Sequence, residues 1–470
     1  MRSARTDLIV AGGYLTLAVL VLSGLWAHPR SGYLIESEQD QTLYEWFFAL
    51  TAHQVTHFES PFSTSLQNFP DGVNLMANTL MYGFGVPFTP VTLLFGPTVT
   101  FALALTLGLS GTAFAWYLVF SRELVTSEIA AAIAGLFCGF APAMISHTNG
   151  HPNYVVLVLL PFIARRVIKM VRHAEAGPEA GTARDSIALG LLVAMQIALG
   201  EEPLLLFALG FAVFGLAYLR TRRAIVRTLR AIARPVLLAA LITLALTGLP
   251  LPWFVFGWIP PLNGMIESRL AMAAIPAIAI ILALGAQRAI DHWRATTAKW
   301  RPVAWFTALA CALLPLTPTT LPVVERTPTP AFFADGTVRQ YISDGSVVIV
   351  PPAAPKDAIA LRWQLDSDFT FPLVGGYYVG PGADGSAHYG PMTRPTGNML
   401  TLIRMFGAIP VIDQPARDQA LADLRFWHAD VVVLPPTRHA DALRRAVDEL
   451  LGVPAREVDG VWLWDVRTLV

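Results

Sequence analysis

The feature that most constrains this chain is a series of nine apolar runs in its first 318 residues, separated by short charged segments. Hydrophobic residues make up 54% of the chain and charged residues only 14%, whereas roughly 25% of the residues in soluble proteins are charged. So few charges cannot cover a soluble surface, and long apolar runs cross a bilayer as helices. The sequence therefore predicts a polytopic α-helical membrane protein of about nine spans, at 7–27, 96–120, 129–146, 152–168, 186–200, 203–219, 236–258, 270–286 and 302–318.

The distribution of Lys and Arg predicts how these spans are oriented. If the N-terminus is cytoplasmic, the segments on its side carry eighteen basic residues, and the opposite segments up to residue 269 carry only Arg30 and Arg269. Cytoplasmic loops are enriched in Lys and Arg. We therefore expect a multi-pass protein of the cell membrane with a cytoplasmic N-terminus and an extracytoplasmic C-terminal part.

The C-terminal part, residues 319–470, reads as a small extracytoplasmic α/β domain that follows the transmembrane domain, residues 1–318. A proline-rich linker, TPTTLPVVERTPTP, leads into it. Its Gly-rich stretch at 374–391 contains no GxGxxG fingerprint that precedes a helix, so we interpret it as a loop and not a nucleotide site. The expected strands are 346–350, 430–434 and 461–466, and the expected helices are 416–428 and 439–451.

Net charge and cysteine content exclude several classes of protein. The chain has 33 basic and 33 acidic residues, so it lacks the basic surplus of a nucleic-acid-binding protein. Its two cysteines, Cys138 and Cys311, both fall in apolar runs. This placement excludes a disulfide scaffold and a Cys-based zinc site.

The first outer loop, about residues 28–95, combines acidic and aromatic residues. Asp40 lies near the start of a predicted helix over 39–58, where the helix dipole favours a carboxylate. Asp40 is therefore either a helix cap or a functional carboxylate. One side of this helix is apolar, so we expect it to lie along the membrane interface. The apolar residues on that side are Leu43, Trp46, Phe47 and Leu50.

The remaining outer turns also carry polar and ionisable side chains between apolar runs. Such side chains are costly at membrane depth and usually face a cavity or one another. We therefore take them as candidate binding residues for a substrate or a donor phosphate. They are His147, Asn149, His151, Glu201, Glu202, Asn263 and Arg269.

Each of these candidates has an alternative interpretation. His147 and His151 are spaced as a metal half-site, but a tight turn favours hydrogen bonding or phosphate contact. Glu201 and Glu202 can instead mark the membrane interface. Arg269 can be a snorkelling anchor, or it can bind an anion at the N-terminus of its helix.

Several segments together resemble the GT-C superfamily of polytopic membrane glycosyltransferases, and most closely its actinobacterial-type members. The resemblance covers roughly residues 1–290, and the C-terminal part fits the outer soluble domain that members carry. The matching segments, in chain order on one face, are EQDQTLYEW with Asp40, SPFST at 60–64, NFPDGVNL at 68–75, PVTLLFGP at 90–97, SHTNGHPN at 146–153, GEEP at 200–203 and PLNGMIESRLA at 261–271.

The resemblance implies an enzyme that moves a sugar from a polyprenyl-phosphate donor to a glycan, lipid or protein acceptor of the cell envelope. In that family an acidic residue of the first outer loop acts as general base or binds a metal, a role that the resemblance gives to Asp40. Arg269, His147 and His151 would stabilise the leaving phosphate. Glu201 or Glu202 would orient the acceptor or pair with Arg269. A single displacement would invert the anomeric carbon.

No cofactor is certain, and a divalent metal, Mg or Mn, is the candidate that the resemblance leaves open. The expected partners are the lipid-linked donor, the acceptor and membrane lipids, without nucleic acid. Two other functions stay open: a non-catalytic protein of envelope assembly, and a transporter of a lipid-linked sugar. A transporter would carry ionisable groups in mid-span or paired broken helices, and the spans here hold few such groups away from their outer ends.

Overall fold

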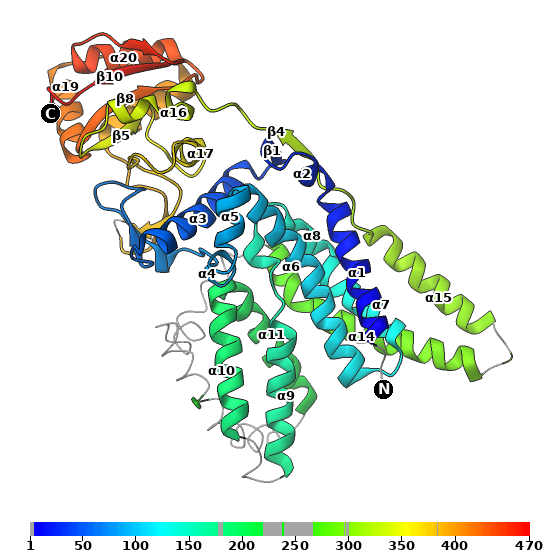
Figure 1. The fold of residues 1–470 in the computed structure, drawn as a ribbon. Helices are drawn as coiled ribbons and strands as arrows, with labels where there is room; N and C mark the ends of the chain where they lie inside the picture. Colours follow the sequence, from blue (N-terminus) through cyan, green and yellow to red (C-terminus); the bar gives the residue numbers. More distant parts are fainter. Residues whose placement is uncertain are drawn as a thin grey trace. The chain divides into compact units, whose positions relative to one another are not determined.

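The computed structural model describes residues 4–176, 182–219, 237–238, 267–295, 297, 300–382 and 384–470 of the chain (Figure 1). It divides into two compact units. Unit 1 consists of Met1–Ser37 and Met81–Val324, and unit 2 consists of Glu38–Leu80 and Glu325–Val470. This grouping differs from the division at residues 318 and 319 that the sequence predicts, because part of the first loop packs with the C-terminal residues.

Unit 1 is built from helices and one short sheet. Its strand β1 (Gly32–Leu34) pairs with β4 (Val323–Glu325), so part of the proline-rich linker is held in a sheet. Its helices are α1 (Ala4–Val21), α2 (Ser23–Ala27), α4 (Tyr82–Gly85), α5 (Thr89–Phe95), α6 (Pro97–Val119), η2 (Phe120–Leu124), α7 (Glu128–Phe140), α8 (Pro142–Thr148), η3 (Pro152–Tyr154), α9 (Leu160–Ala176), α10 (Thr182–Leu199), α11 (Glu201–Leu219), α14 (Glu267–Ala295), α15 (Trp300–Leu313) and η5 (Leu314–Leu316).

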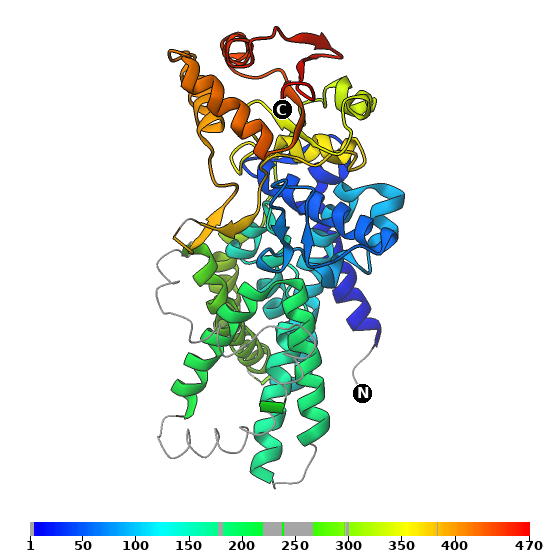
Figure 2. The ribbon, with the colours of Figure 1, turned by 90° about the vertical axis from the view of Figure 1, so that its left-hand side faces the viewer.

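The helices α9, α10 and α11 lie side by side in unit 1, as Figures 1 and 2 show. The sequence places spans over all three. In α9, however, the span expected at 152–168 is interrupted, because 152–154 form a 3-10 turn and the α-helix begins only at Leu160.

The expected count of about nine spans is not supported. Within the described residues, three helices are long and apolar enough to cross a membrane, at Ala4–Val21, Pro97–Leu124 and Ala271–Ala295. A fourth span results if α7 and α8, which meet at a 41° bend, are taken as one. The run expected at 152–168 is broken by a 3-10 turn, whereas α10 and α11 are continuous helices over the runs expected at 186–200 and 203–219. The run expected at 236–258 lies outside the described residues except for 237–238.

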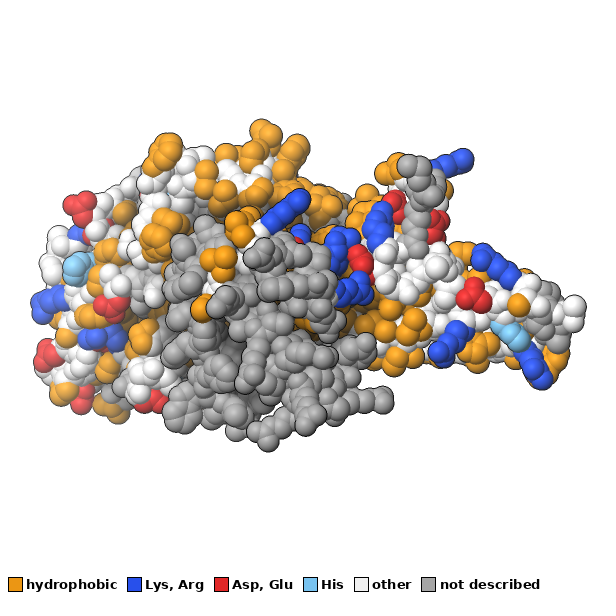
Figure 3. Space-filling view, turned by 90° about the horizontal axis from the view of Figure 1, so that it is seen from below, with side chains coloured by type: hydrophobic (Ala, Val, Ile, Leu, Met, Phe, Trp, Pro, Cys, Tyr) orange, Lys and Arg blue, Asp and Glu red, His pale blue; other side chains and the backbone are white. Residues whose placement is uncertain are grey.

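Exposed apolar side chains mark two of these long helices, α1 and α14, whereas Pro97–Leu124 is mostly buried. Leu8 and Ile9 of α1 and Ile281 of α14 are all largely exposed. Figure 3 shows that hydrophobic side chains occupy much of the described surface in that view. Because a soluble protein rarely exposes apolar surface on this scale, unit 1 has the surface of a membrane-embedded protein.

Glycine lets α6 and α7 approach each other closely in unit 1. A Cβ placed on Gly139 would lie 2.5 Å from Ala113 Cβ and 2.6 Å from the carbonyl oxygen of Leu109. A Cβ on Gly135 would lie 2.7 Å from the carbonyl oxygen of Ala113. Small residues at helix crossings are typical of membrane proteins, where close backbone packing holds helices together.

Unit 2 contains a four-stranded sheet in the order β5-β8-β10-β9. β5 (Ser346–Ile349) and β8 (Ala429–Leu434) are parallel, and β10 (Val461–Asp465) runs antiparallel to both β8 and β9 (Arg456–Val458). Helices α18 (Pro395–Phe406), α19 (Gln414–Phe426) and α20 (Ala440–Leu451) pack together and supply apolar side chains to the core beside the sheet. The strands and helices expected near these positions are therefore confirmed.

The remaining elements of unit 2 come from the first loop and the start of the C-terminal part. They are α3 (Glu38–His57), β2 (Ser63–Thr64), β3 (Val73–Asn74), η1 (Leu75–Ala77), α16 (Ala331–Ala334), η6 (Thr337–Gln340), α17 (Ile359–Asp366), β6 (Val379–Pro381) and β7 (Ala387–Tyr389).

Backbone hydrogen bonds join the first loop to the C-terminal residues of unit 2. The N–H groups of Asn68 and Phe69 donate to the carbonyl oxygens of Gly375 and Leu373, at 2.8 and 3.2 Å. The side-chain amide of Asn78 also bonds to the Val379 backbone: its Nδ2 donates to Val379 O at 3.0 Å, and its Oδ1 accepts from Val379 N–H at 2.8 Å. These bonds explain why the loop belongs to this unit.

The prediction that the first-loop helix lies along the membrane interface is wrong. Trp46, Phe47 and Leu50 of α3 are buried, and so are Gln41 and Glu45. Trp46 Nε1 donates a hydrogen bond of 2.7 Å to the Gln364 side chain. Aromatic residues occur both in helices buried within a protein and in helices at the membrane interface, so the sequence pattern does not distinguish these two environments.

The Gly-rich stretch forms the β6–β7 hairpin and the loops around it, as the interpretation as a loop expects. At Gly390 the backbone has φ of +82°, and a Cβ would lie 2.5 Å from Cδ of Pro355. Glycine is therefore needed at this position for a close approach within the protein.

Candidate functional site

Asp40 lies in the first turn of α3 in unit 2, as the sequence predicts. Its carboxylate is half-buried, and the Tyr377 hydroxyl donates a hydrogen bond of 2.7 Å to Oδ1. Tyr377 is held in turn, because its backbone N–H donates to Gln67 Oε1 at 2.9 Å. The carboxylate is thus fixed by a side chain more than three hundred positions away, which no local pattern reveals.

A buried ion cluster lies one turn further along α3. Glu45 is fully buried and accepts hydrogen bonds from Arg326 at 2.7 and 2.5 Å, from Arg362 at 3.3 Å and from Gln41 at 2.8 Å. We call Glu45, Arg326 and Arg362 the ion cluster. Burial by itself would raise the pKa of Glu45, but the two guanidinium groups outweigh it and hold that pKa below its ordinary value.

The ion cluster is structural, because protein groups surround its carboxylate completely. Arg362 also pairs with Asp366 at 2.9 Å, one turn along α17. Nothing in the sequence distinguishes Glu45 from the other acidic residues of the first loop. The regular four-residue spacing of Arg362 and Asp366 is the one local signal that a charged network exists here.

A second polar group, which we call the polar cluster, lies in unit 1. Arg269, in the first turn of α14, pairs with Glu202 of α11 at 2.8 Å and stands 4.8 Å from the centre of the Tyr154 ring. The Tyr154 ring contacts His147 with 4.7 Å between centroids, and His147 lies 6.1 Å from His151. The structure therefore brings together four of the predicted residues, plus Tyr154, which sequence analysis missed.

Asn149 makes its hydrogen bonds outside the polar cluster. Asn149 Nδ2 donates to the carbonyl oxygen of Ile35 at 2.8 Å, and the Asn149 carbonyl accepts from Ser37 Oγ at 2.7 Å. Asn149 thus fixes the turn that follows β1. Glu201 begins α11 and is half-buried. Asn263 lies outside the described residues.

Two buried side-chain amides near Tyr154 have polar atoms without a hydrogen-bond partner among the described residues. Asn153 Oδ1 and both polar atoms of the Gln196 side chain are buried and have no partner in the described part of the chain. Gly200 connects them, because its N–H bonds to Gln196 O and its Cα faces the Asn153 backbone. Unsatisfied buried polar groups cost free energy, so a bound polar ligand or water is the natural partner for them.

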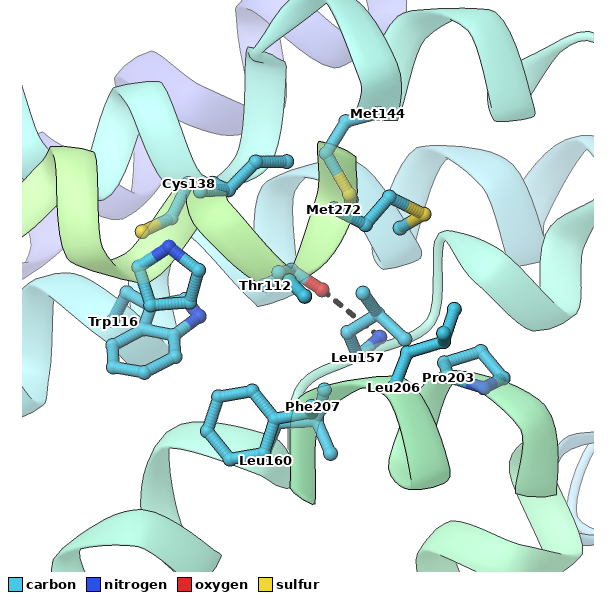
Figure 4. Close-up of a pocket in the computed structure, with 13 residues that line it drawn as sticks. Thr112, Trp116, Cys138, Met144, Leu157, Leu160, Pro203, Leu206, Phe207 and Met272 are labelled. Atoms are coloured by element: carbon cyan, nitrogen blue, oxygen red, sulfur yellow. Dashed lines mark hydrogen bonds between the residues drawn. The ribbon is translucent and has the colours of Figure 1, made fainter. Parts of the chain in front are cut away.

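A small apolar cavity of about 30 Å³ lies between α6, α7, α8, α11 and α14 of unit 1. Figure 4 shows Trp116 and Phe207 among its lining residues, with the backbone N–H of Leu157 donating to Thr112 Oγ1 at 3.0 Å. A space of this size holds about one water molecule. It is a packing void and not a substrate site.

Among the residues that the structure describes, no group of three or more His, Cys, Asp or Glu side chains is arranged to hold a metal ion. Tyr154 is the aromatic neighbour of His147 and His151, and the described part of the chain places no third His, Cys, Asp or Glu with them as a metal ligand. The metal half-site interpretation of the two histidines therefore finds no support in these residues.

Comparisons with known proteins find similar chains among the solved structures. No protein-family model and no curated protein sequence matches the chain. A solved structure of the oligosaccharyltransferase AglB from the archaeon Archaeoglobus fulgidus, in complex with an inhibitory peptide and a dolichol-phosphate, is similar over 66% of this chain at 15% identity and a TM-score of 0.36. The chain spans 37% of the length of that protein.

Proposed function

We propose that this protein is a membrane glycosyltransferase that moves a sugar from a polyprenyl-phosphate donor to a cell-envelope acceptor. The observation that carries the proposal is the Asp40 carboxylate, which the Tyr377 hydroxyl fixes at 2.7 Å in the first turn of α3. A positioned carboxylate accepts the proton of an attacking hydroxyl as that hydroxyl becomes acidic in the transition state. The acceptor oxygen then bonds to the anomeric carbon, which inverts as the lipid phosphate leaves.

The leaving lipid phosphate does not need an acid, but it needs positive charge beside it. Arg269 is the cation of the polar cluster, and its side chain keeps 20% of its surface exposed. A guanidinium binds phosphate through charge-assisted hydrogen bonds. Glu202 would hold this guanidinium in place, and His147 and His151 would add hydrogen-bond donors.

Roles for the remaining predicted residues belong to the same proposal. Glu201 would orient the acceptor, and Asn149 and Asn263 would support the donor site. We place the reaction on the outer face of the cell membrane, with a glycan, lipid or protein as acceptor. A divalent metal, Mg or Mn, enters the proposal only because the first loop resembles that of GT-C enzymes.

Transfer activity of an Asp40→Asn variant tests the proposal. The full chain is reconstituted in vesicles with radiolabelled polyprenyl-phosphate sugar and an extract of envelope acceptors, and label leaving the lipid is measured. Loss of a general base lowers rates by about 10²- to 10⁴-fold. Tyr377→Phe keeps the carboxylate but removes its hydrogen bond, so its rate should fall by about tenfold or less.

Glu59→Gln is the matched control, because Glu59 is another carboxylate of the first loop and half of its side chain is exposed. Its rate should equal that of the unmodified protein. Full activity of Asp40→Asn at normal expression would remove Asp40 from the mechanism. A transporter would instead carry label across the bilayer without transferring it, and Asp40→Asn would leave that movement intact.

A further inference from the structure

A large cleft in unit 2 has no role in the chemistry described so far. Its volume is about 1300 Å³, larger than the roughly 300–1,000 Å³ of small-molecule pockets. It is lined by residues of the first-loop segment 68–77, by 352–355 and by the β6–β7 hairpin. Residues of α18 and of α19 complete the lining. We call this space the unit 2 cleft.

Aromatic side chains are one component of the unit 2 cleft. Tyr389 of β7 is 63% exposed, and Phe426, at the end of α19, is also exposed. Tyr378, Phe69 and Trp427 line the cleft as well. Exposed rings supply apolar faces on which a ligand can stack, and at Tyr389 the fold gains little from the ring, because it stands on a strand that is exposed throughout.

Neutral hydrogen-bonding groups are the second component. Asn74 and Asn398 are exposed in the lining, and Thr393, Thr401 and Ser386 add hydroxyl groups. The several glycines of the hairpin also expose backbone. Such groups pair with hydroxyls as readily as with amides.

The unit 2 cleft has few charged side chains in its described lining, and its arginine is already paired within the protein. In the described lining, Asp71 is the carboxylate, Arg394 is the guanidinium and His388 is an exposed imidazole. Arg394 pairs with Asp423 at 2.7 Å and stacks on the Phe426 ring at 4.0 Å. Asp71 lies close enough to Tyr378 to add to the effect of burial, and both raise the pKa of the Tyr378 phenol.

This lining excludes other classes of ligand. An anionic polymer needs cations that are not already paired, and the one guanidinium is paired. A lipid tail needs a continuous apolar wall, and the amides and hydroxyls interrupt it. A sugar ring has an apolar face and a rim of hydroxyls, so it matches stacked rings beside neutral polar groups.

We propose that the unit 2 cleft binds a neutral oligosaccharide, and that this oligosaccharide is the acceptor of the transfer reaction. Tyr377 holds Asp40, and the next residue, Tyr378, lines the cleft. Asn68, which follows the Tyr377 partner Gln67, also lines the cleft, so the two segments that hold Asp40 in place continue into the cleft wall. In this proposal the bound acceptor extends from the cleft toward Asp40. The acceptor role depends on the proposed function, whereas binding itself does not.

Binding of immobilised oligosaccharides to the full chain in detergent tests the proposal. The panel holds neutral tetra- to hexasaccharides of mannose, arabinose, galactose and glucose, uronic-acid oligosaccharides of the same length, and an uncharged heptapeptide. We expect at least one neutral class to bind, and Tyr389→Ala to weaken that binding by about tenfold.

Phe406→Ala is the matched control, because Phe406 is 69% exposed on α18 and does not line the cleft. Its affinity should be unchanged. The proposal is overturned if no neutral class binds, if the acidic glycans or the peptide bind as tightly, or if Tyr389→Ala behaves like Phe406→Ala. Asp40→Asn should bind normally, so loss of transfer with retained binding separates failure of the reaction from failure of the cleft.

Discussion

The two units hold their charged residues in opposite ways. In unit 2, Glu45 is fully enclosed between Arg326 and Arg362. In unit 1, Arg269 and Glu202 keep 20% and 33% of their side-chain surface exposed. An enclosed charge has only protein partners and stabilises the fold, whereas a partly exposed one can exchange its partner for a ligand. Burial and pairing, and not residue type, distinguish a structural charge from a functional one.

The units also differ in how their backbones pack. Unit 1 brings α6 and α7 together through glycine, and unit 2 packs aliphatic and aromatic side chains against a sheet. An added methyl group at a helix crossing should therefore destabilise unit 1, whereas loss of a buried side chain or of its charge should destabilise unit 2.

The largest effect is expected for Glu45→Gln. This change leaves the buried Arg326 guanidinium without its carboxylate, while Arg362 keeps its pairing with Asp366, and the loss costs about 3–5 kcal/mol of unfolding free energy. Hydrogen exchange of the β5 and β8 amides, followed by mass spectrometry on the full chain, should accelerate by roughly a hundredfold or more. Glu59→Gln is the control and should leave exchange unchanged. Equal exchange in both variants would show that the ion cluster does not stabilise unit 2.

The Glu45 carboxylate should also make the stability of unit 2 depend on pH. The pKa of folded Glu45 lies below its ordinary value of 4.5, so protonation favours the unfolded state. Its stabilisation is complete above about pH 4.5 and is lost as the pH falls through the folded pKa. The stability difference from Glu45→Gln should therefore shrink on acidification; a difference that is constant down to pH 3 would contradict this.

A smaller effect, on activity, is expected for Arg269→Gln. Loss of a charge-assisted hydrogen bond costs about 1.5–3 kcal/mol, so transfer should slow by roughly 10- to 100-fold, with a raised KM for the donor. Arg301→Gln is the control, because Arg301 also stacks on an aromatic ring, at 5.4 Å from Trp300. If Glu202→Gln raised the donor KM equally, the pair would act only as a structural unit.

The smallest effect is expected for Gly139→Ala. The added methyl group would lie against the α6 backbone, and overpacking of this kind costs about 1–3 kcal/mol. Thermal unfolding of unit 1 in detergent should therefore occur at a lower temperature. Gly12→Ala is the matched control, because no atom lies within 4 Å of a Cβ placed there. A lower unfolding temperature for Gly12→Ala as well would show that the effect does not come from helix packing.

Local sequence patterns were sufficient for the C-terminal sheet and for the position of Asp40 at a helix start. Strands β5, β8 and β10 follow continuous runs of apolar residues, and such runs form buried strands wherever neighbours are available. The apolar character of α1 is likewise visible without a structure. The count of about nine spans is not supported by the described residues, because composition does not show where a run is broken by a 3-10 turn or a bend, as in 141–159.

Which segments are apolar, which are charged and which form the C-terminal strands can be predicted without a structure, because these properties depend on neighbouring residues. Which distant side chains meet depends on the three-dimensional fold. The pairing of Asp40 with Tyr377, the burial of α3, the partners of Glu45 and the contact of Arg269 with Tyr154 all join residues far apart in the chain. The free energy of such contacts depends on the enclosure that the whole fold provides, and no local pattern encodes it.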